Sequence, residues 1–390
     1  MQDATEYDLL ILGAGCAGLS LAMRLAQSGY LGRVGIVEPR REYHDDRSWC
    51  FWAPDEHPLA ELVSCRWSRW LVSQRNGPLI DGSASGSSYQ YVNSLDFYRR
   101  ALLSIQSSRN ISFLQGESAQ RVYRLNHHLM VTTATASLRS RYLVDTRPPA
   151  SRQLSQSLLY QCFFGQVVTL ADDSPSAFDV EAAELMTDMC SDSQGLQFSY
   201  VLPFEKHRAL VEVTRFSRVP PDNEQLKREL LELFHRRGWQ VASIEREEAA
   251  VLPMGLPTLA PEPLPGYVRA GTGGGALRSA SGYGFQRIQR WAERCCASLL
   301  RGEPPTPQMA DPARQAWMDQ LFLRVLRDQP EQAPLLFERM FTRVPGPVML
   351  RFLSDQAGWL DSLRLISSLP RGPFVKSLLG LSGRSSTGVS

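Results

Sequence analysis

The chain has 390 residues, 43% of them hydrophobic and 21% charged, which is typical of a globular protein large enough for two closely connected domains. The 42 Lys and Arg side chains nearly balance 40 Asp and Glu, and the formal net charge of +2 gives no general electrostatic reason to bind nucleic acid. The seven cysteines and six histidines are scattered without metal-ligand spacing, so we expect reduced thiols in the cytoplasm and no metal site.

No uninterrupted apolar segment reaches the length of a transmembrane helix, and the first residues lack the layout of a signal peptide. We therefore expect a chain that does not span a membrane. Leu, Phe and Val are concentrated toward the C-terminus, where they fit either a core or a face that lies on a membrane.

A strand, a glycine-rich turn, a helix and a second strand are predicted at the start of the chain. An apolar run leads into Gly13, Gly15 and Gly18, and a second apolar run ends at Glu38, twenty residues after Gly18. In a dinucleotide-binding unit these glycines allow a tight turn, close approach of a pyrophosphate and close packing of helix on strand, and the acid binds the ribose hydroxyls. The spacing predicts a dinucleotide site, and its place in the chain favours FAD over NAD.

The next elements alternate between strands and helices. A loop over residues 43–52 turns from polar to aromatic, strands are expected near 65–73 and 89–92, and Ser94 is a candidate helix cap. A further strand ends at Asp145, and the chain from about 151 to 251 is strand-rich apart from one helix with an Asp222 and Gln225 capping pair. Glycine-dense sequence at 271–275 then precedes another amphipathic helix and a helical C-terminal region.

These elements predict an α/β fold with discontinuous domains. We expect one nucleotide-binding domain made of residues 1–150 and 251–300, a strand-rich domain over 151–250, and C-terminal helices over 301–390.

Five blocks in this order resemble the bacterial lycopene cyclase family: residues 46–52, 145–147, 211–214, 253–255 and 271–285. The resemblance implies the flavoprotein fold of aromatic hydroxylases. In this fold a Rossmann-like FAD-binding domain, here residues 1–150 and 251–300, is interleaved with an antiparallel-sheet domain that binds the substrate, here residues 151–250. It also implies an isomerase, an intramolecular lyase that converts the acyclic ends of lycopene into β-ionone rings and so forms γ-carotene and β-carotene. Reduced FAD is implied as the cofactor and NAD(P)H as its reductant, with no net redox change.

Ring closure requires a proton on a terminal alkene, attack of a second alkene on the resulting cation, and loss of a proton. An alkene is a poor base, so the acid must be held protonated in an apolar setting. The family's essential acid maps to Glu212, which alternation places on one strand face with Leu210 and Thr214. Val213 stands where the family has a second acid, on the opposite face.

Further site residues follow from the N-terminal glycine motif and from the same blocks. The predicted cofactor-binding residues are Gly13, Gly15, Gly18, Glu38, Arg47, Asp145, Gly273, Gly274, Gly275 and Gly282, and the predicted substrate-binding residues are Trp49, Phe51, Trp52 and Tyr283. Aromatic faces can stabilise a carbocation, although a core cluster explains each of Trp49, Phe51 and Trp52 equally well. Asp145 fits either a group near the flavin or a simple turn.

Two other functions remain open from the sequence. An FAD-dependent monooxygenase or prenyl reductase that uses NAD(P)H would share the N-terminal motif, and a non-catalytic flavin or carotenoid carrier would share the fold. For the cyclase we expect lycopene and related acyclic carotenoids as substrates, attachment to the inner face of the cell membrane, and other carotenoid-pathway enzymes as candidate partners.

Overall fold

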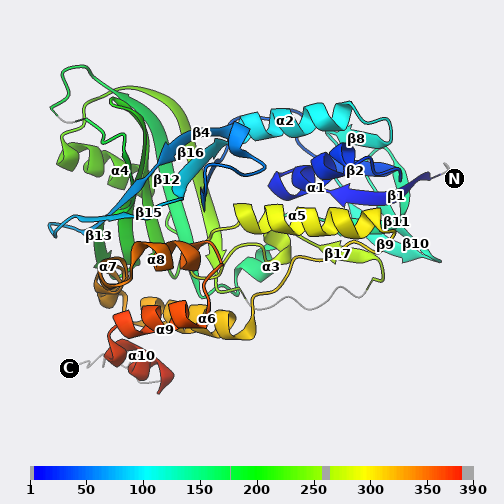
Figure 1. Cartoon of the computed structure of the whole chain (residues 1–390). Helices are drawn as coiled ribbons and strands as arrows, with labels where there is room; N and C mark the ends of the chain where they lie inside the picture. Colours follow the sequence, from blue (N-terminus) through cyan, green and yellow to red (C-terminus); the bar gives the residue numbers. More distant parts are fainter. Residues whose placement is uncertain (1–3, 176, 257–263, 380–390) are drawn as a thin grey trace, which may run out of the picture.

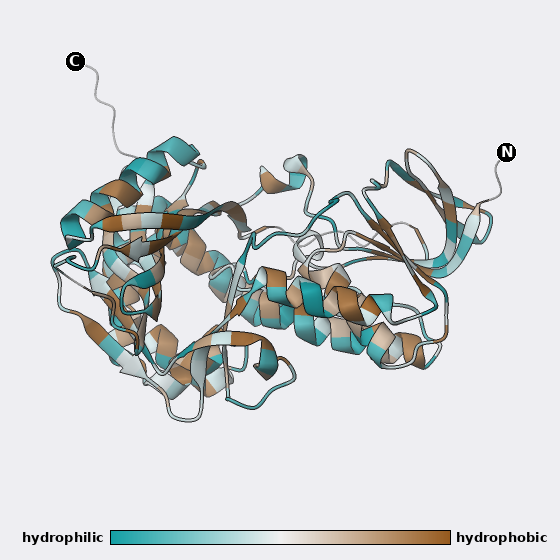
Figure 2. Cartoon of the chain, turned by 90° about the horizontal axis from the view of Figure 1, so that it is seen from above, coloured by the Kyte–Doolittle hydropathy of each residue, from teal (hydrophilic) through white to brown (hydrophobic). Residues whose placement is uncertain are grey.

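Two seven-stranded sheets organise the computed structural model, which describes residues 4–175, 177–256 and 264–379 (Figure 1). Seen from above, the first sheet lies at one end of the molecule, and the second sheet and the C-terminal helices lie at the other (Figure 2). None of the described helices is long and apolar enough to cross a membrane.

The first sheet is built around a parallel core. Strand β1 (Thr5–Leu12) lies between β2 (Val34–Glu38) and β11 (Ser137–Asp145), and all three run parallel. The remaining strands are β8 (Ile111–Gln115), β9 (Arg121–Leu125), β10 (His128–Thr132) and β17 (Tyr267–Arg269). One face packs on α1 (Cys16–Gln27), α2 (Ser94–Gln106) and α5 (Phe285–Leu300). Both faces of β1 are covered by other parts of the domain. This explains why the C-terminal half of the strand is an uninterrupted run of apolar residues instead of an alternation of apolar and polar ones.

The second sheet is mostly antiparallel and follows the order β16-β12-β15-β14-β13-β5-β6. Its strands are β5 (Arg69–Gln74), β6 (Ile80–Ser83), β12 (Leu159–Leu170), β13 (Ala182–Asp192), β14 (Gly195–Glu205), β15 (Arg208–Ser217) and β16 (Val241–Met254). One face packs on α4 (Asn223–Arg237). The Asp222 side chain accepts a hydrogen bond from the Gln225 amide, which is half of the capping box that the sequence predicts, whereas the Gln225 side chain donates to Gln194 and Glu229.

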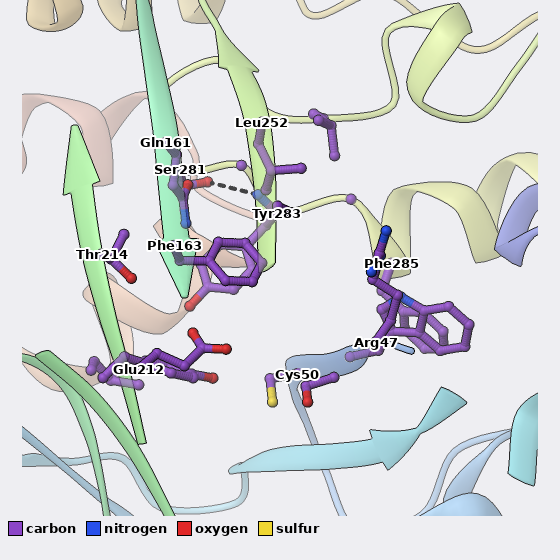
Figure 3. Close-up of a pocket in the computed structure, with 18 of the residues that line it drawn as sticks. Arg47, Cys50, Gln161, Phe163, Glu212, Thr214, Leu252, Ser281, Tyr283 and Phe285 are labelled. Carbon is purple, nitrogen blue, oxygen red and sulfur yellow. Dashed lines mark hydrogen bonds between the residues drawn. The ribbon is translucent and has the colours of Figure 1, made fainter. Parts of the chain in front are cut away.

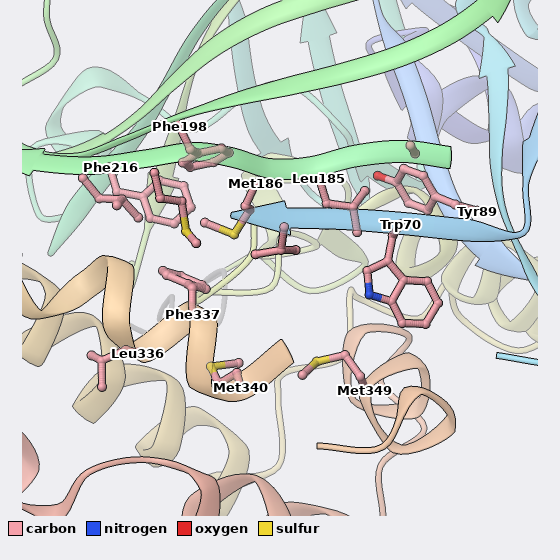
Figure 4. Close-up of a cluster of buried hydrophobic side chains, with 14 of the residues drawn as sticks. Trp70, Tyr89, Leu185, Met186, Phe198, Phe216, Leu336, Phe337, Met340 and Met349 are labelled. Carbon is pink, nitrogen blue, oxygen red and sulfur yellow. The ribbon is translucent and has the colours of Figure 1, made fainter. Parts of the chain in front are cut away.

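The C-terminal helices pack on the other face of the second sheet and share one apolar core with it (Figure 4). They are α6 (Ala313–Asp328), α7 (Ala333–Arg343), α8 (Gly346–Leu353), α9 (Trp359–Ser368) and α10 (Arg371–Leu378). Short elements complete the described chain: α3 (Ser151–Leu154) and the 3-10 turns Ala60–Leu62, Thr272–Gly274 and Pro330–Gln332.

The structure differs from the sequence prediction near residues 65–73. One strand is predicted there, but the structure has two strands in different sheets. β4 (Val63–Trp67) forms a small sheet with β3 (Ser48–Ala53) and β7 (Ser88–Asn93), whereas β5 pairs with β13 of the second sheet. Residues 69–83 therefore extend the sheet domain, although the sequence grouped them with the nucleotide-binding part. The apolar side chains of β5 explain this, since Trp70 and Val72 pack in the core beneath the C-terminal helices.

The cap of α2 also differs. Asn93, not Ser94, accepts hydrogen bonds from the first helical amides, those of Leu95 and Asp96. The Ser94 hydroxyl instead accepts from the amides of Asp46 and Arg47 and so holds the preceding loop in place.

A cluster of buried ion pairs joins the C-terminal helices to the segment before α5. Arg278, 2% exposed, lies 3.2 Å from Asp319 of α6 and 3.6 Å from Asp355 after α8. Arg287 of α5 lies 2.6 Å from the same Asp355 and 2.7 Å from Asp311. Each guanidinium thus meets two carboxylates from the C-terminal region.

Candidate active site

Two adjoining cavities lie between the sheets. The sheet-edge cavity, about 800 Å³, is found where β1, β2 and β11 end, and the inter-sheet cavity, about 480 Å³, reaches under the second sheet. Their walls share Gly15, Cys16, Arg40, Thr272 and Ile288. An elongated ligand in the first cavity would therefore extend into the second.

The glycine turn between β1 and α1 forms one wall of the sheet-edge cavity. Gly13 has φ +88°, and a Cβ on Gly18 would lie 2.0 Å from the Gly13 carbonyl oxygen, so both glycines are required by the chain itself. Gly15 is different, because an added Cβ would meet only Arg40 Nη2, at 3.9 Å. No crowding among the described residues explains this glycine, and it lines both cavities at the N-terminus of α1.

Two acids line the same cavity at the ends of the two strands that flank β1. The Glu38 carboxylate, at the end of β2, accepts hydrogen bonds from the Ala14 amide at 2.5 Å and from Arg40 Nε at 2.8 Å. Asp145, at the end of β11, accepts from Arg147 Nη2 and from the Tyr267 hydroxyl, both at 2.6 Å. Burial by itself raises the pKa of Asp145, but hydrogen bonds from Arg147 and Tyr267 outweigh it, and the net pKa is lowered.

The predicted glycines after β17 support this cavity from behind. A Cβ on Gly273 would lie 2.1 Å from the Arg147 carbonyl oxygen, and one on Gly274 would lie 2.8 Å from Arg269, so the segment packs tightly against the turn after β11. Thr272, not Gly273, Gly274 or Gly275, reaches the described cavity walls. Gly282, with φ +70°, does line the inter-sheet cavity.

These features fit a bound dinucleotide. The open position at Gly15 leaves room for a pyrophosphate, and the free amides at the start of α1 favour negative charge there. Glu38 lines this cavity at the end of β2, where a carboxylate can accept hydrogen bonds from ribose hydroxyls. In the inter-sheet cavity, the buried Gln161 Oε1 has no hydrogen-bond partner within the described chain, so an acceptor is available to a ligand.

The far end of the inter-sheet cavity is apolar. β13, β14 and β15 supply side chains from the sheet, and α7 supplies Phe337 and Met340 opposite them (Figure 4). The sheet side consists of Leu185, Met186, Phe198 and Phe216. Such a lining suits a hydrocarbon chain and excludes water from the polar groups further in.

Glu212 lies at the middle of the inter-sheet cavity on β15 (Figure 3). Alternation places it on the cavity face with Thr214, as expected, while Val213 packs beneath α4 on the other face. Its side chain shares a hydrogen bond with Glu248 of β16. Burial, and next the adjacent Glu248 carboxylate, raise the pKa of Glu212 well above its usual range.

Glu248 is the member of this pair that has a cationic partner. Its Oε2 lies 2.7 Å from Arg246 Nη1 and accepts a hydrogen bond from the Ser48 hydroxyl at 3.0 Å. Arg246 also lies 3.1 Å from Asp45, which reaches the more exposed rim. Glu212 is therefore a neutral acid next to a fixed carboxylate.

Phenol and thiol groups surround the acid. Tyr89 exchanges hydrogen bonds with Tyr200 at 3.0 Å and with Tyr283 at 3.1 Å, and Cys50 joins the same group. Burial raises the pKa of Cys50 and of all three tyrosines, so these groups are neutral at physiological pH. They present aromatic faces and hydroxyls without adding charge.

The strand pleat separates the three predicted aromatic residues of β3. Trp49 lines the inter-sheet cavity and stacks on Phe285 at 5.3 Å. Phe51 stacks on the same ring at 5.1 Å but does not reach the wall of that cavity, and Trp52 points the other way, into contact with Trp70 and Tyr89. Arg47, at the polar end, lines the cavity and donates to the Asp46 carbonyl.

Sequence reasoning missed Glu248, Arg246, Cys50 and Tyr200. Cys50 stands within the aromatic block and follows Trp49 on the same strand, so its side chain points to the opposite face. This alternation could have identified Cys50 from the sequence. The other three come from strands whose pairing is set by long-range register, and no local motif marks them.

Curated relatives match over nearly the whole chain. A lycopene beta-cyclase of Pseudescherichia vulneris is 26% identical over 387 residues, which cover 94% of this chain and 95% of that protein. A lycopene beta-cyclase of Pantoea ananas is 24% identical over 399 residues, with coverage of 96% and 97%.

Solved structures share the fold at low identity. A geranylgeranyl bacteriochlorophyll reductase-like protein from Thermoplasma acidophilum has a TM-score of 0.62 at 12% identity, covering 97% of this chain and 100% of that one. The p-nitrophenol 4-monooxygenase of Pseudomonas putida has a TM-score of 0.56 at 13% identity, with coverage of 98% and 100%. The expected flavoprotein fold is thereby confirmed. The family described as lycopene cyclase protein matches residues 8–379, and the chain belongs to this family.

Proposed function

We propose that the protein is a lycopene beta-cyclase, which isomerises the acyclic ends of lycopene to β-ionone rings. The observation that supports this most is a neutral, buried Glu212 that faces an apolar cavity. An acid kept protonated where water is excluded is what protonation of an alkene requires.

The chemistry follows from the residues around Glu212. Its carboxyl gives a proton to the terminal alkene, so a C–H bond forms as the π bond breaks and a Glu212 carboxylate remains. A second alkene attacks the tertiary cation to close the ring, and a ring proton then passes to a base, so that a neutral product forms at constant mass. The Glu212 carboxylate takes up a proton before the next ring closes. Tyr200, Tyr283 and Trp49 present aromatic faces that stabilise positive charge without capturing it.

Gly15 would hold the pyrophosphate of FAD, and Glu38 would hold its ribose. When bound and reduced by NAD(P)H, FAD would supply negative charge beside the carbocation. The chain's own contribution there is the N-terminus of α5, which begins directly after Gly284 and orients positive partial charge toward this end of the cavity.

Expression in a lycopene-accumulating bacterium tests the activity. We expect γ-carotene and β-carotene with the mass of lycopene, separated by chromatography and identified by absorption and mass spectra. A product heavier by oxygen or by hydrogen would instead identify a monooxygenase or a reductase. Unchanged lycopene, with FAD bound to the protein, would favour a carrier.

We also propose that the protein works while lying on a membrane. α9 exposes Trp359, Leu360, Leu363 and Ile366 at helical spacing, and α10 continues this surface with Val375, Leu378 and Leu379. The exposed Arg364, Arg371 and Lys376 lie among them, a combination that suits anionic headgroups. α9 also packs on α7 and α8, which border the apolar cavity.

A double substitution on α9 tests this surface. We expect L360D/L363D to lower binding to vesicles of phosphatidylglycerol and phosphatidylethanolamine by roughly tenfold or more, because two apolar side chains leave the interface. Co-sedimentation measures it. L31D, which changes a leucine that is 92% exposed at the far end of the molecule, is the control. Equal binding by wild type and L360D/L363D would contradict the proposal.

A further inference from the structure

The row of residues across β15, β12 and β16 brings two glutamates together over a glycine. In the antiparallel register, Gly165 of β12 is opposite Glu212 on one side and opposite Glu248 on the other. The two glutamates therefore lie on strands separated by two strand spacings, about 10 Å, and point to the same face. Their side chains can meet only by passing over the middle residue.

Gly165 leaves room for the Glu212 side chain to cross β12, because glycine has no side chain. A Cβ at position 165 would lie 2.4 Å from Glu212 Cγ and 3.2 Å from its Cβ, which are not the mobile end of that side chain. Gly165 is in a regular strand, where glycine is otherwise unfavourable. The contact with Glu212 is a physical reason for glycine at this position.

The environment fixes which carboxyl holds the proton. Glu248 has a cation, Arg246, and a hydroxyl donor, Ser48, whereas Glu212 has no ion pair among the described residues and faces Glu248 itself. We propose that Glu248 is a positioning residue that keeps the Glu212 carboxyl protonated and aimed into the cavity, and that Gly165 is the gap that allows the two side chains to meet. This inference rests on the proposed role of Glu212 as the acid.

Other titratable groups face the pair without competing for this role. They are Asp45 in the preceding loop, Cys50 on β3, Tyr89 and Tyr91 on β7, Tyr200 on β14, Arg246 on β16 and Tyr283 before α5. Burial raises the pKa of the thiol and the phenols, so they keep their protons. Asp45 has its own cationic partner, because its carboxylate lies 3.1 Å from Arg246.

The pH dependence of cyclisation tests the proposal. Activity needs protonated Glu212, so it falls as the pH rises through the pKa of that group. In E248Q the neighbouring negative charge is gone and Arg246 is no longer neutralised, and both changes lower the pKa of Glu212. We expect the fall in rate to move to lower pH by about one unit or more. E247Q, which changes the adjacent glutamate on the outer face, should keep the wild-type profile.

A spectroscopic measurement keeps the test independent of turnover. The infrared difference spectrum between wild type and E212Q should contain the C=O stretch of a protonated carboxylic acid near neutral pH. The difference spectrum between E248Q and E248Q/E212Q should contain the same band, but this band should disappear at a lower pH than in the wild-type background. A band that titrates identically in both backgrounds would overturn the role of Glu248. Cyclisation by E212Q at the wild-type rate would instead overturn the proposed acid.

The glycine provides a second arm. G165A should bind FAD normally and cyclise at least tenfold more slowly, because the new methyl group displaces Glu212. G372A, in open space on α10, is the matched control. Wild-type turnover by G165A would show that the gap is not needed and would overturn that part of the proposal.

Discussion

Replacing Glu212 by Gln is expected to abolish cyclisation, with a loss of at least about 100-fold, while FAD remains bound. The amide has nearly the same shape, so it keeps the packing against Gly165, but it cannot donate a proton to an alkene. The group is buried at 6% exposure, and water cannot substitute for it without first entering an apolar cavity. Pigment analysis in lycopene-accumulating cells measures the cyclisation, and the flavin absorbance of the purified protein measures the bound FAD.

E205Q is the matched control for this result. Glu205 ends the neighbouring strand β14, and its side chain is 73% exposed, so its substitution should leave turnover and flavin content unchanged. If E212Q loses both FAD and activity, Glu212 is structural. If it retains activity, another group supplies the proton.

Two glycines of the N-terminal turn should respond differently to alanine. Without FAD, G15A is expected to melt at the wild-type temperature, because Gly15 has φ −78° and an added Cβ has open space. G15A should nevertheless bind FAD at least about tenfold more weakly, since the methyl group occupies the place of a phosphate. G18A is expected to destabilise even the flavin-free protein, because its Cβ would lie 2.0 Å from the Gly13 carbonyl oxygen.

Flavin fluorescence titration and thermal melts of the flavin-free protein separate the two effects. G358A, where an added Cβ meets nothing within 4 Å, controls for the general cost of replacing glycine. Wild-type FAD affinity in G15A would mean that the pyrophosphate lies elsewhere.

Local patterns predicted the parts of this site that depend on one strand or one turn. The glycine spacing indicated the turn before α1, and alternation along β15 placed Glu212 and Val213 on opposite faces. The partner of Glu212 was beyond such reasoning, because Glu248 is 36 residues later and meets it only through the register that β12 sets with two other strands. The same limit applies to β5, whose pairing with β13 no local pattern specifies.

The aromatic block shows a different limit. Composition grouped Trp49, Phe51 and Trp52, but the pleat of β3 divides them, and the intervening Cys50 faces the acid instead. Strict alternation of side chains along a strand would have predicted that Trp49 and Phe51 lie on one face and Trp52 on the other.

The buried ion pairs of Arg278 and Arg287 bear on how the protein can be shortened. A fragment that stops at the end of α5 would keep both guanidinium groups and lose Asp311, Asp319 and Asp355, their acidic partners. Removing one side of a buried pair costs about 3–5 kcal/mol. The segment that carries Gly282 and Tyr283 begins a few residues after Arg278, so such a truncation would disturb the flavin end of the cavity as well as its apolar cover. The two ends of the active site therefore depend on one set of ion pairs, and residues 301–390 cannot be removed without disturbing both ends.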